Sequence, residues 1–240
     1  MILKRILKKL KALYKNFKQV ISNTNYVSIG ENCLTDNILD RHSLKSFSTP
    51  YSHGRSNLDY AIKLESEGYK NLMSPKYLYH DYVGETKVVR NKYYSESENI
   101  YLELHQNGFE FTHHDVINND AHKNSYERKA LRMSSLNKRK KLKFLYHYRD
   151  NANKDLNKII KKASEFLAYY QKRNIKCEFI FFTQDIISNE ADRSIIKVHD
   201  ANNIRGYVFK TLNIWGGDDP DLLWARTDDD LIRKMIKEIK

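Results

Sequence analysis

The chain has 240 residues and a formal net charge of +12, with 40% hydrophobic and 12% aromatic residues. This composition is too apolar for a disordered chain and too polar for an integral membrane protein, and the length favours a single domain. The two cysteines, Cys33 and Cys177, form no Cys-x-x-Cys pair, which gives no sign of a structural zinc site or a redox motif and is typical of a reducing cytoplasm.

Much of the positive charge lies at the start of the chain. Residues 1–20 hold seven basic residues and no acidic one, so the other 220 residues carry only +5. Apolar residues recur there at helical spacing, which predicts a basic amphipathic helix over residues 1–22, followed by a domain over residues 23–240. Seven charges in this segment exclude a spanning helix. We expect it to bind the anionic inner face of the cytoplasmic membrane. Docking on the domain, or on a partner protein or nucleic acid, is the alternative.

A short apolar strand is predicted at residues 26–29, and a helical pattern follows at residues 34–41. Gly30 ends the strand, so Cys33 lies at or near a helix N-terminus, just beyond the carboxyl end of a strand. Unpaired N–H groups and partial positive charge at such an end favour thiolate over thiol and can hold an oxyanion. Cys33 is therefore a candidate nucleophile, with Asn32 and nearby N–H groups as the oxyanion site and Gly30 beside the substrate. The alternative is a small buried hydrophobe.

The segment 46–57 is rich in hydroxyl side chains and comes just before a helix expected to end at Glu65. Helix N–H groups and Arg55 could bind a phosphate or carboxylate here, with Ser48 and His53 as further substrate contacts. The alternative is a capped turn that binds no ligand.

Residues 109–115 begin with strand-like alternation and end in the run His113-His114-Asp115. A cysteine nucleophile needs a neighbouring base, and a carboxylate that fixes the tautomer of that base improves it. His113 or His114 is a candidate base and Asp115 a candidate carboxylate. Adjacent residues on a strand point to opposite faces, so we expect only one of the two histidines to face a site. The alternatives are metal binding by the histidines and helix capping by Asp115.

The second half of the chain alternates strands and helices. An apolar strand at residues 144–148, a long helical pattern at 155–173 and the apolar run 177–183 form a βαβ unit, which implies a mainly parallel sheet. Cys177 begins the last run and is expected to be inert core. Further strands are expected at residues 195–198 and 208–214, and further helices at residues 126–136 and 229–239. The predicted fold is α/β, a single domain with a mainly parallel sheet flanked by helices. Ligands of such sheets bind at the carboxyl ends of strands.

Six Asp residues lie within residues 218–230. Asp228 and its two acidic neighbours immediately precede the last predicted helix, where helix capping and the helix dipole favour them. Asp218 and Asp219 follow two glycines and are candidates for contacts with sugar hydroxyls or a divalent cation.

Several segments resemble the bacterial family labelled putative papain-like cysteine peptidase, whose members are often encoded among surface-polysaccharide genes. They are residues 28–33, 44–50, 111–115, 126–132 and 144–149. The resemblance follows the chain in order over most of residues 25–230. The basic segment at the start lies outside it.

This resemblance implies Cys33 as nucleophile and His113 or His114 as base. The chain departs from the family at residues 50–53, where Pro-Tyr-Ser-His stands in place of a Pro-Phe-Asp-Trp-like stretch, so no carboxylate role transfers there. The block around Cys33 is also similar to that of capsule acyltransferases that use a cysteine in an α/β fold. Peptidase and acyltransferase share an acyl-thioester intermediate and differ in the acceptor that attacks it.

These observations predict a cysteine-dependent hydrolase or acyltransferase that acts in surface-polysaccharide assembly. The expected substrate is a polysaccharide or sugar-lipid; no cofactor is expected, and a coenzyme A thioester is one candidate acyl donor. Basic residues do not interleave with aromatics in the domain, so no nucleic-acid partner is expected. Two alternatives stay open: a glycosyl- or phosphosugar-transferase using Asp218, Asp219 or Asp228 with a divalent cation, and a non-catalytic membrane-associated scaffold.

Overall fold

The computed structural model describes residues 22–95, 107–136, 138–149 and 155–240. The basic helix predicted for residues 1–22 therefore falls, apart from its last residue, outside the described part of the chain. Within that part, no helix is both long enough and apolar enough to cross a membrane.

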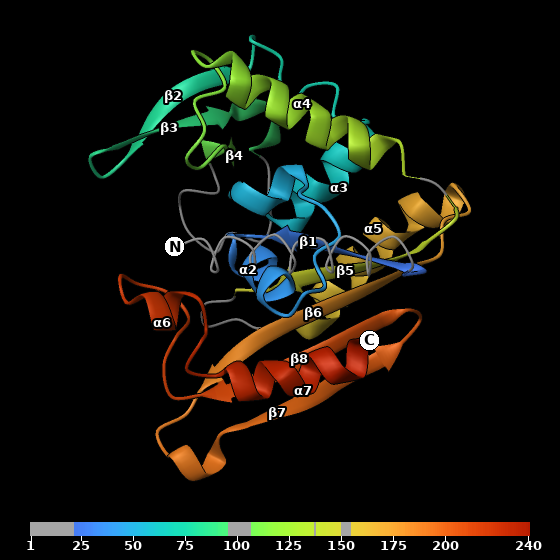
Figure 1. Ribbon diagram of the computed structural model, residues 1–240, viewed down its shortest axis with the longest axis vertical. Helices are drawn as coiled ribbons and strands as arrows, with labels where there is room; N and C mark the ends of the chain where they lie inside the picture. Colours follow the sequence, from blue (N-terminus) through green and yellow to red (C-terminus); the bar gives the residue numbers. More distant parts are fainter. Residues whose placement is uncertain (1–21, 96–106, 137, 150–154) are drawn as a thin grey trace, which may run out of the picture.

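A five-stranded sheet with strand order β1-β5-β6-β8-β7 crosses the middle of the molecule (Figure 1). Its strands are β1 (Thr24–Gly30), β5 (Lys141–His147), β6 (Cys177–Ile186), β8 (Ile204–Thr211) and β7 (Ser194–Ala201). The first four are parallel to one another, and β7 runs antiparallel at one edge. The prediction of a single α/β domain with a mainly parallel sheet is confirmed. The strand predicted at residues 208–214 is shifted, because β8 begins at Ile204 and ends at Thr211.

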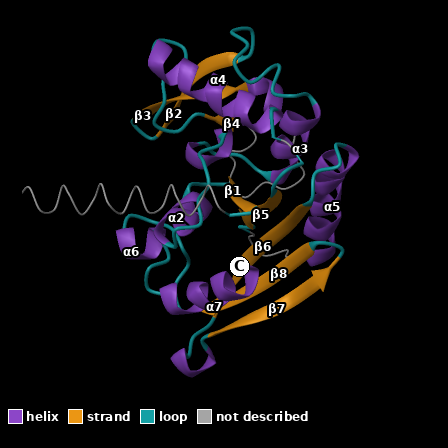
Figure 2. Cartoon of the chain, turned by 45° about the vertical axis from the view of Figure 1, so that its right-hand side comes forward, coloured by secondary structure: helices purple, strands orange, loops and turns teal. Residues whose placement is uncertain are grey.

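Helices cover both faces of this sheet (Figure 2). They are α3 (Leu58–Ser66) and α5 (Leu156–Lys172) on one face, and α2 (Leu34–Arg41) and α7 (Asp229–Ile239) on the other. Side chains of β6 alternate between the two layers: Phe181 packs in the first core cluster and Phe182 in the second. A strand buried on both faces favours apolar residues at successive positions, which explains the apolar run Phe179–Phe182 in its sequence.

A smaller antiparallel sheet of order β2-β3-β4 lies beside the main one, next to α4 (Asp120–Ser134). Its strands are β2 (Leu78–Val83), β3 (Thr86–Asn91) and β4 (Phe109–Glu110). The β2–β3 hairpin was not predicted from the sequence; it turns at Gly84, whose φ of 58° suits glycine. Helix α4 begins six residues before its predicted start, because the side chain of Asn119 accepts a hydrogen bond from His122 N and caps it.

Candidate active site

Cys33 is the N-cap residue of α2, in the short turn that follows β1. The turn is tight at Gly30, where an added Cβ atom would lie 2.6 Å from the backbone oxygen of Asn32 and 2.8 Å from Thr35 Oγ1. Gly30 is therefore required by the close approach of the chain to itself, and it does not line the pocket at Cys33. The side-chain carbonyl of Asn32 accepts a hydrogen bond from Leu34 N at 3.0 Å, which fixes the first turn of the helix.

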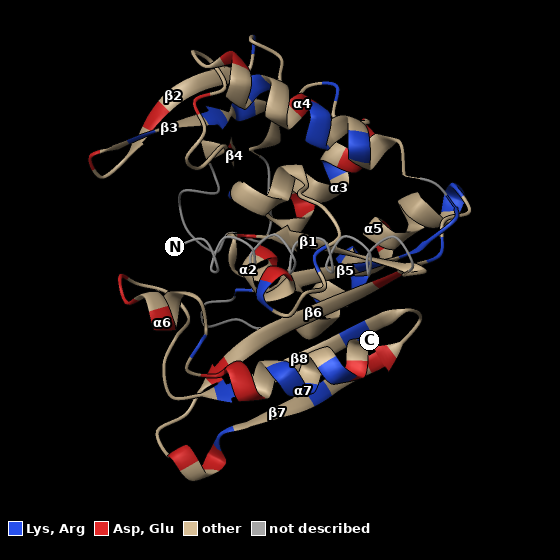
Figure 3. Cartoon of the chain, in the orientation of Figure 1, with Lys and Arg blue, Asp and Glu red and all other residues tan. Residues whose placement is uncertain are grey.

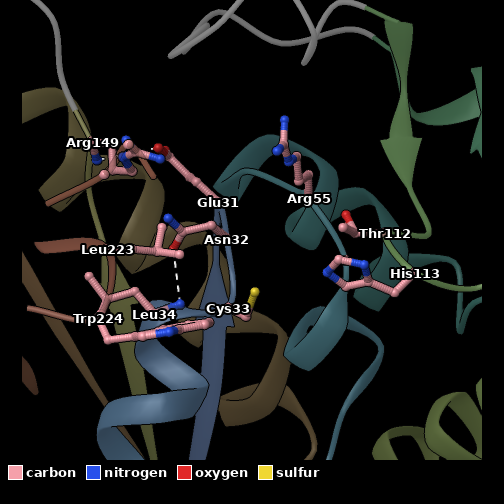
Figure 4. A pocket seen from close by; sticks show the side chains of 13 residues that line it. Glu31, Asn32, Cys33, Leu34, Arg55, Thr112, His113, Arg149, Leu223 and Trp224 are labelled. Carbon is pink, nitrogen blue, oxygen red and sulfur yellow. Dashed lines mark hydrogen bonds between the residues drawn. The ribbon is translucent and has the colours of Figure 1, made fainter. Parts of the chain in front are cut away.

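A pocket of about 400 Å³, called the main pocket below, opens at Cys33 (Figure 4). It is lined by residues 31–34, 54–55, 112–113, 149, 216–217 and 223–224. Residues 31–34 follow β1 and residue 149 follows β5, so the pocket lies at the carboxyl ends of two neighbouring parallel strands. This is the edge of a parallel sheet at which ligands bind.

The position of Cys33 at a helix N-terminus is not enough to ionise its thiol. Burial raises the pKa of the Cys33 thiol, and the nearby Asp36 carboxylate raises it further. The backbone N–H of Cys33 and the charge of Arg55 lower the pKa, but by less. The direction is opposite to that predicted from a helix N-terminus, because loss of hydration disfavours the charged form more than the local N–H groups and cation favour it. Cys33 is therefore a thiol at neutral pH, and attack by its sulfur requires a base that removes the proton.

His113 lines the main pocket together with Cys33. It follows β4 in a loop, and its backbone φ of 65° lies in the left-handed region, which is uncommon for a residue other than glycine. In Figure 4 the imidazole of His113 and the sulfur of Cys33 lie on facing sides of the pocket. No hydrogen bond joins these two described side chains, as is common for a base and nucleophile before a substrate binds.

His114 faces a different part of the molecule. Its Nδ1 lies 3.0 Å from the backbone oxygen of Thr112, and its ring packs edge-on against Tyr126 at 5.3 Å between centroids. Burial lowers the pKa of His114. His53 packs beside it at 5.9 Å, and neither ring lines the main pocket. Of the two candidate bases, only His113 shares the main pocket with the cysteine.

Asp115 stabilises a turn. Its carboxylate accepts hydrogen bonds from Ile117 N at 3.1 Å, Asn118 N at 2.9 Å and Asn118 Nδ2 at 3.0 Å, and lies 3.4 Å from His80 Nε2. Slight burial works against ionisation, but these hydrogen bonds outweigh it and lower the pKa of Asp115 to about 2. Among the described residues no carboxylate hydrogen-bonds to His113, so Asp115 is not placed to orient that imidazole.

Arg55 lines the main pocket and is fixed to β4. Its backbone pairs with Glu110 in both directions at 2.9 and 3.0 Å, and its Nε lies 3.5 Å from Glu110 Oε1. The buried Glu110 also accepts a hydrogen bond from Thr112 Oγ1 at 2.8 Å and pairs with Arg90 at 2.7 Å. Glu110 therefore holds together Arg55 and the loop that carries His113, a role that sequence reasoning did not assign.

Glu31 and Arg149 also line the main pocket and were missed in the sequence. The Glu31 carboxylate accepts a hydrogen bond from Tyr146 Oη at 2.5 Å and from Arg149 N at 3.3 Å, which ties together the ends of β1 and β5. A signal for Arg149 was present, because it comes directly after a predicted strand, at the edge where ligands bind.

Most of the segment 46–57 makes contacts within the fold and does not reach the main pocket. Thr49 and Ser52 form a capping box around a short 3₁₀ helix, η1 (Pro50–His53). Ser48 lies outside the main pocket, where its backbone carbonyl accepts a hydrogen bond from an arginine of α4 at 2.8 Å. Of the three substrate contacts predicted in this segment, only Arg55 lines the main pocket.

Asp218 and Asp219 do not line the main pocket, although the two glycines before them do. Asp219 caps the short helix α6 (Pro220–Leu223): its side chain accepts hydrogen bonds from Asp221 N at 2.7 Å and Leu222 N at 3.3 Å. This helix, which was not predicted, brings Leu223 and the following tryptophan to the pocket.

The second group of acidic residues is also used within the fold. Asp228 is the N-cap residue of α7, but its carboxylate bonds to Arg193 Nε at 2.8 Å and to Trp215 Nε1 at 2.8 Å instead of to helix N–H groups. Asp229 and Asp230 lie in the first turn of α7, with basic residues toward its other end (Figure 3). In the part of the chain that the structure describes, no cluster of three His, Cys, Asp or Glu residues could hold a metal ion.

Comparison with known proteins adds one finding. A model of the family described as putative papain-like cysteine peptidase matches residues 24–185. No curated protein and no solved structure matches the chain. The matched residues include Cys33 and His113, whereas the stretch from Gly216 to Trp224 that completes the pocket comes after them.

Proposed function

This chain belongs to the family described as putative papain-like cysteine peptidase, and from that premise we propose that it is a cysteine hydrolase or acyltransferase. Cys33 would be the nucleophile and His113 the general base. The observation that carries this proposal is that both side chains line one pocket at the carboxyl edge of the parallel sheet. The alternative base, His114, packs against Tyr126 outside that pocket.

The proposed reaction follows from the protonation state of the thiol. His113 removes the proton of Cys33 as the sulfur attacks the acyl carbon of the substrate. The carbonyl oxygen becomes an oxyanion, which the backbone N–H of Cys33 and the side-chain amide of Asn32 would bind. The His113 imidazolium then gives its proton to the leaving group, and an acyl-thioester forms on Cys33. Water or an acceptor hydroxyl, deprotonated by His113, attacks this thioester and releases the thiol.

We also propose that the acceptor belongs to a surface polysaccharide or sugar-lipid and that a coenzyme A thioester can serve as acyl donor. The enzyme would work at the inner face of the membrane. The support for this location is the basic amphipathic sequence of residues 1–20, which lies outside the described residues. Under this proposal an acyltransferase reaction is favoured over hydrolysis when the sugar hydroxyl reaches the thioester before water does.

A direct test is the reaction of the full chain with p-nitrophenyl acetate, followed by mass spectrometry of the acylated peptides. We expect an acetyl adduct on Cys33 and a loss of at least about a thousandfold in enzyme-dependent ester cleavage in Cys33→Ala. Cys177→Ala is the matched control and should retain both. Full activity in Cys33→Ala, or acetylation of Cys33 no faster than that of Cys177, would overturn the proposal.

A further inference from the structure

The main pocket has two walls, with Cys33 between them, and only one of the two is polar throughout (Figure 4). Three polar side chains line one wall: Arg55, Thr112 and His113. The other wall carries three apolar side chains, Leu34 at the start of α2, Leu223 at the end of α6, and Trp224, and the polar side chains of Glu31, Asn32 and Arg149 lie beside them. Nothing in the proposed acyl-transfer step uses these three apolar side chains, which are called the apolar wall below.

The chemistry of acyl transfer decides which part of a substrate meets each wall. After attack by Cys33, the tetrahedral carbon carries an oxyanion, a leaving group and the substituent of the acyl group. His113 must reach the leaving atom to give it a proton, so the leaving group lies on the polar wall. The acyl substituent then points away from His113, toward the apolar wall.

The apolar wall is held in place by the rest of the fold. Arg41, near the end of α2, donates hydrogen bonds to the backbone oxygens of Trp224 and, at 3.3 Å, Ala225. Arg41 is itself fixed by Asp229 at 3.0 Å. Trp224 packs against the same core cluster that contains Leu34. A wall that is already ordered loses little conformational freedom when a ligand binds to it.

We propose, on the basis of the proposed function, that the apolar wall binds the acyl substituent and selects acyl donors with a bulky apolar or aromatic substituent. Half-buried Leu223 and Trp224 present apolar surface beside the reacting sulfur, and a substituent that covers this surface gains binding that an acetyl group cannot. Each methylene accommodated in such a pocket changes kcat/KM by about 10-fold or more. The pocket volume of about 400 Å³ leaves room for a phenyl ring or a short alkyl chain.

The test compares p-nitrophenyl acetate, hexanoate and phenylacetate. All three have the same leaving group, so its contacts with the polar wall are constant and only the acyl substituent differs. Each kcat/KM is divided by the alkaline hydrolysis rate of the same ester, which removes the difference in chemical reactivity. We expect the wild-type chain to prefer phenylacetate or hexanoate over acetate by at least about 10-fold. In Trp224→Ala this ratio should fall to within about threefold of unity.

Two further variants keep the test decisive if Trp224→Ala folds poorly. Leu223→Ala should lower the same ratio, and Leu223→Trp, which fills the pocket, should lower the phenylacetate rate more than the acetate rate. Ile214→Ala is the matched control, because Ile214 is an exposed apolar residue of the preceding segment that does not line the pocket. Its ratio should equal that of the wild-type chain.

The outcomes separate this inference from the proposed function. If Cys33 is acylated by all three esters at normalised rates that are equal, or if the ratio is unchanged in Trp224→Ala and Leu223→Ala, the apolar wall does not select the acyl group. If none of the esters acylates Cys33, the proposed function itself is wrong.

Discussion

The two cysteines of this chain lie at opposite ends of strands in one sheet, and each lines a pocket. Cys33 follows the carboxyl end of β1, begins α2, and shares its pocket with His113. Cys177 is at the amino end of β6, where its pocket of about 430 Å³ has no histidine in its lining and its sulfur lies 3.8 Å from Leu167 O. Burial raises the pKa of both thiols, that of Cys177 to about 11.

Burial and a cavity therefore do not distinguish a reactive thiol from a structural one in this fold. The difference is the edge of the sheet. At the carboxyl edge, helices begin and loops from several strands meet, so a thiol there can have N–H donors and an imidazole close by. At the amino edge Cys177 meets the carbonyl of Leu167, a residue of α5, which repels a thiolate.

The largest expected effect comes from removing the proposed base, His113, which shares a pocket with Cys33 and has no counterpart in the lining of the pocket at Cys177. His113→Gln should lower kcat/KM for p-nitrophenyl acetate by about 100- to 10,000-fold, the usual contribution of a general base. His114→Gln is the matched control and should change it less than about threefold, because that ring packs outside the main pocket. A larger loss in His114→Gln than in His113→Gln would reverse the assignment.

The second prediction compares the alkylation of the two thiols directly. With iodoacetamide at pH 8, Cys33 should react at least about tenfold faster than Cys177, because Cys33 is partly accessible whereas Cys177 is buried and its pKa is raised to about 11. Since burial raises both pKa values, both rates should continue to rise above pH 8.5, the usual pKa of a free cysteine. Peptide mass spectrometry across pH measures both rates in one sample. Equal rates, or a Cys33 rate that levels off well below pH 8.5, would contradict this description.

The sequence carried enough information to place Cys33, because local signals coincide there. An apolar strand, a glycine that the tight turn requires and a helical pattern follow one another between Tyr26 and Arg41. The long α5 pattern between two apolar strands likewise predicted the parallel sheet, since a crossover helix joins parallel strands. These features depend on residues that are neighbours in the sequence.

Other features depend on distant residues and could not be predicted in the same way. Which histidine shares the pocket with the cysteine depends on the left-handed backbone of His113, a conformation that its residue type does not signal. The direction of the Cys33 pKa depends on enclosure by residues far along the chain. Half-exposed β2 lacks a clear buried face, and its hairpin with β3 was missed for that reason. The apolar wall comes from Trp224 and Leu223, near the other end of the chain.

The comparison also predicts that the same substitution, Cys to Ser, lowers the free energy of unfolding at one of the two positions and hardly changes it at the other. Cys177→Ser places a hydroxyl in a buried, largely apolar site and should lower the free energy of unfolding by about 1–2 kcal/mol. Cys33→Ser, in a half-exposed position beside a pocket, should change it by less than about 0.5 kcal/mol while abolishing activity. Urea unfolding with an unchanged m-value measures both. A larger loss of stability in Cys33→Ser would mean that Cys33 is the structural thiol.

The smallest expected effects come from the charges that act on Cys33. Arg55 favours its thiolate and Asp36 disfavours it, so Arg55→Gln should raise the pKa of Cys33 and Asp36→Asn should lower it. In each variant, the ion-pair partner of the substituted residue remains, and its charge shifts the pKa of Cys33 in the same direction as the substitution does. Glu110, 3.5 Å from Arg55, then adds negative charge near the thiol, and Lys45, 2.5 Å from Asp36, adds positive charge.

Alkylation of Cys33 at pH 8 should therefore slow by about two- to fivefold in Arg55→Gln and quicken by a similar factor in Asp36→Asn, since charge effects of this size are typical of partly solvated pairs. Arg233→Gln, on the exposed side of α7, should change nothing. Arg55→Gln and Asp36→Asn should both leave the alkylation rate of Cys177 unchanged, because burial raises the pKa of that thiol and Lys141 is the charge that lowers it. Equal changes in the alkylation rates of both cysteines would indicate a general loosening of the fold. If only the rate of Cys33 changes, and it falls in Arg55→Gln but rises in Asp36→Asn, the charges at the carboxyl edge of the sheet set the ionisation of this thiol.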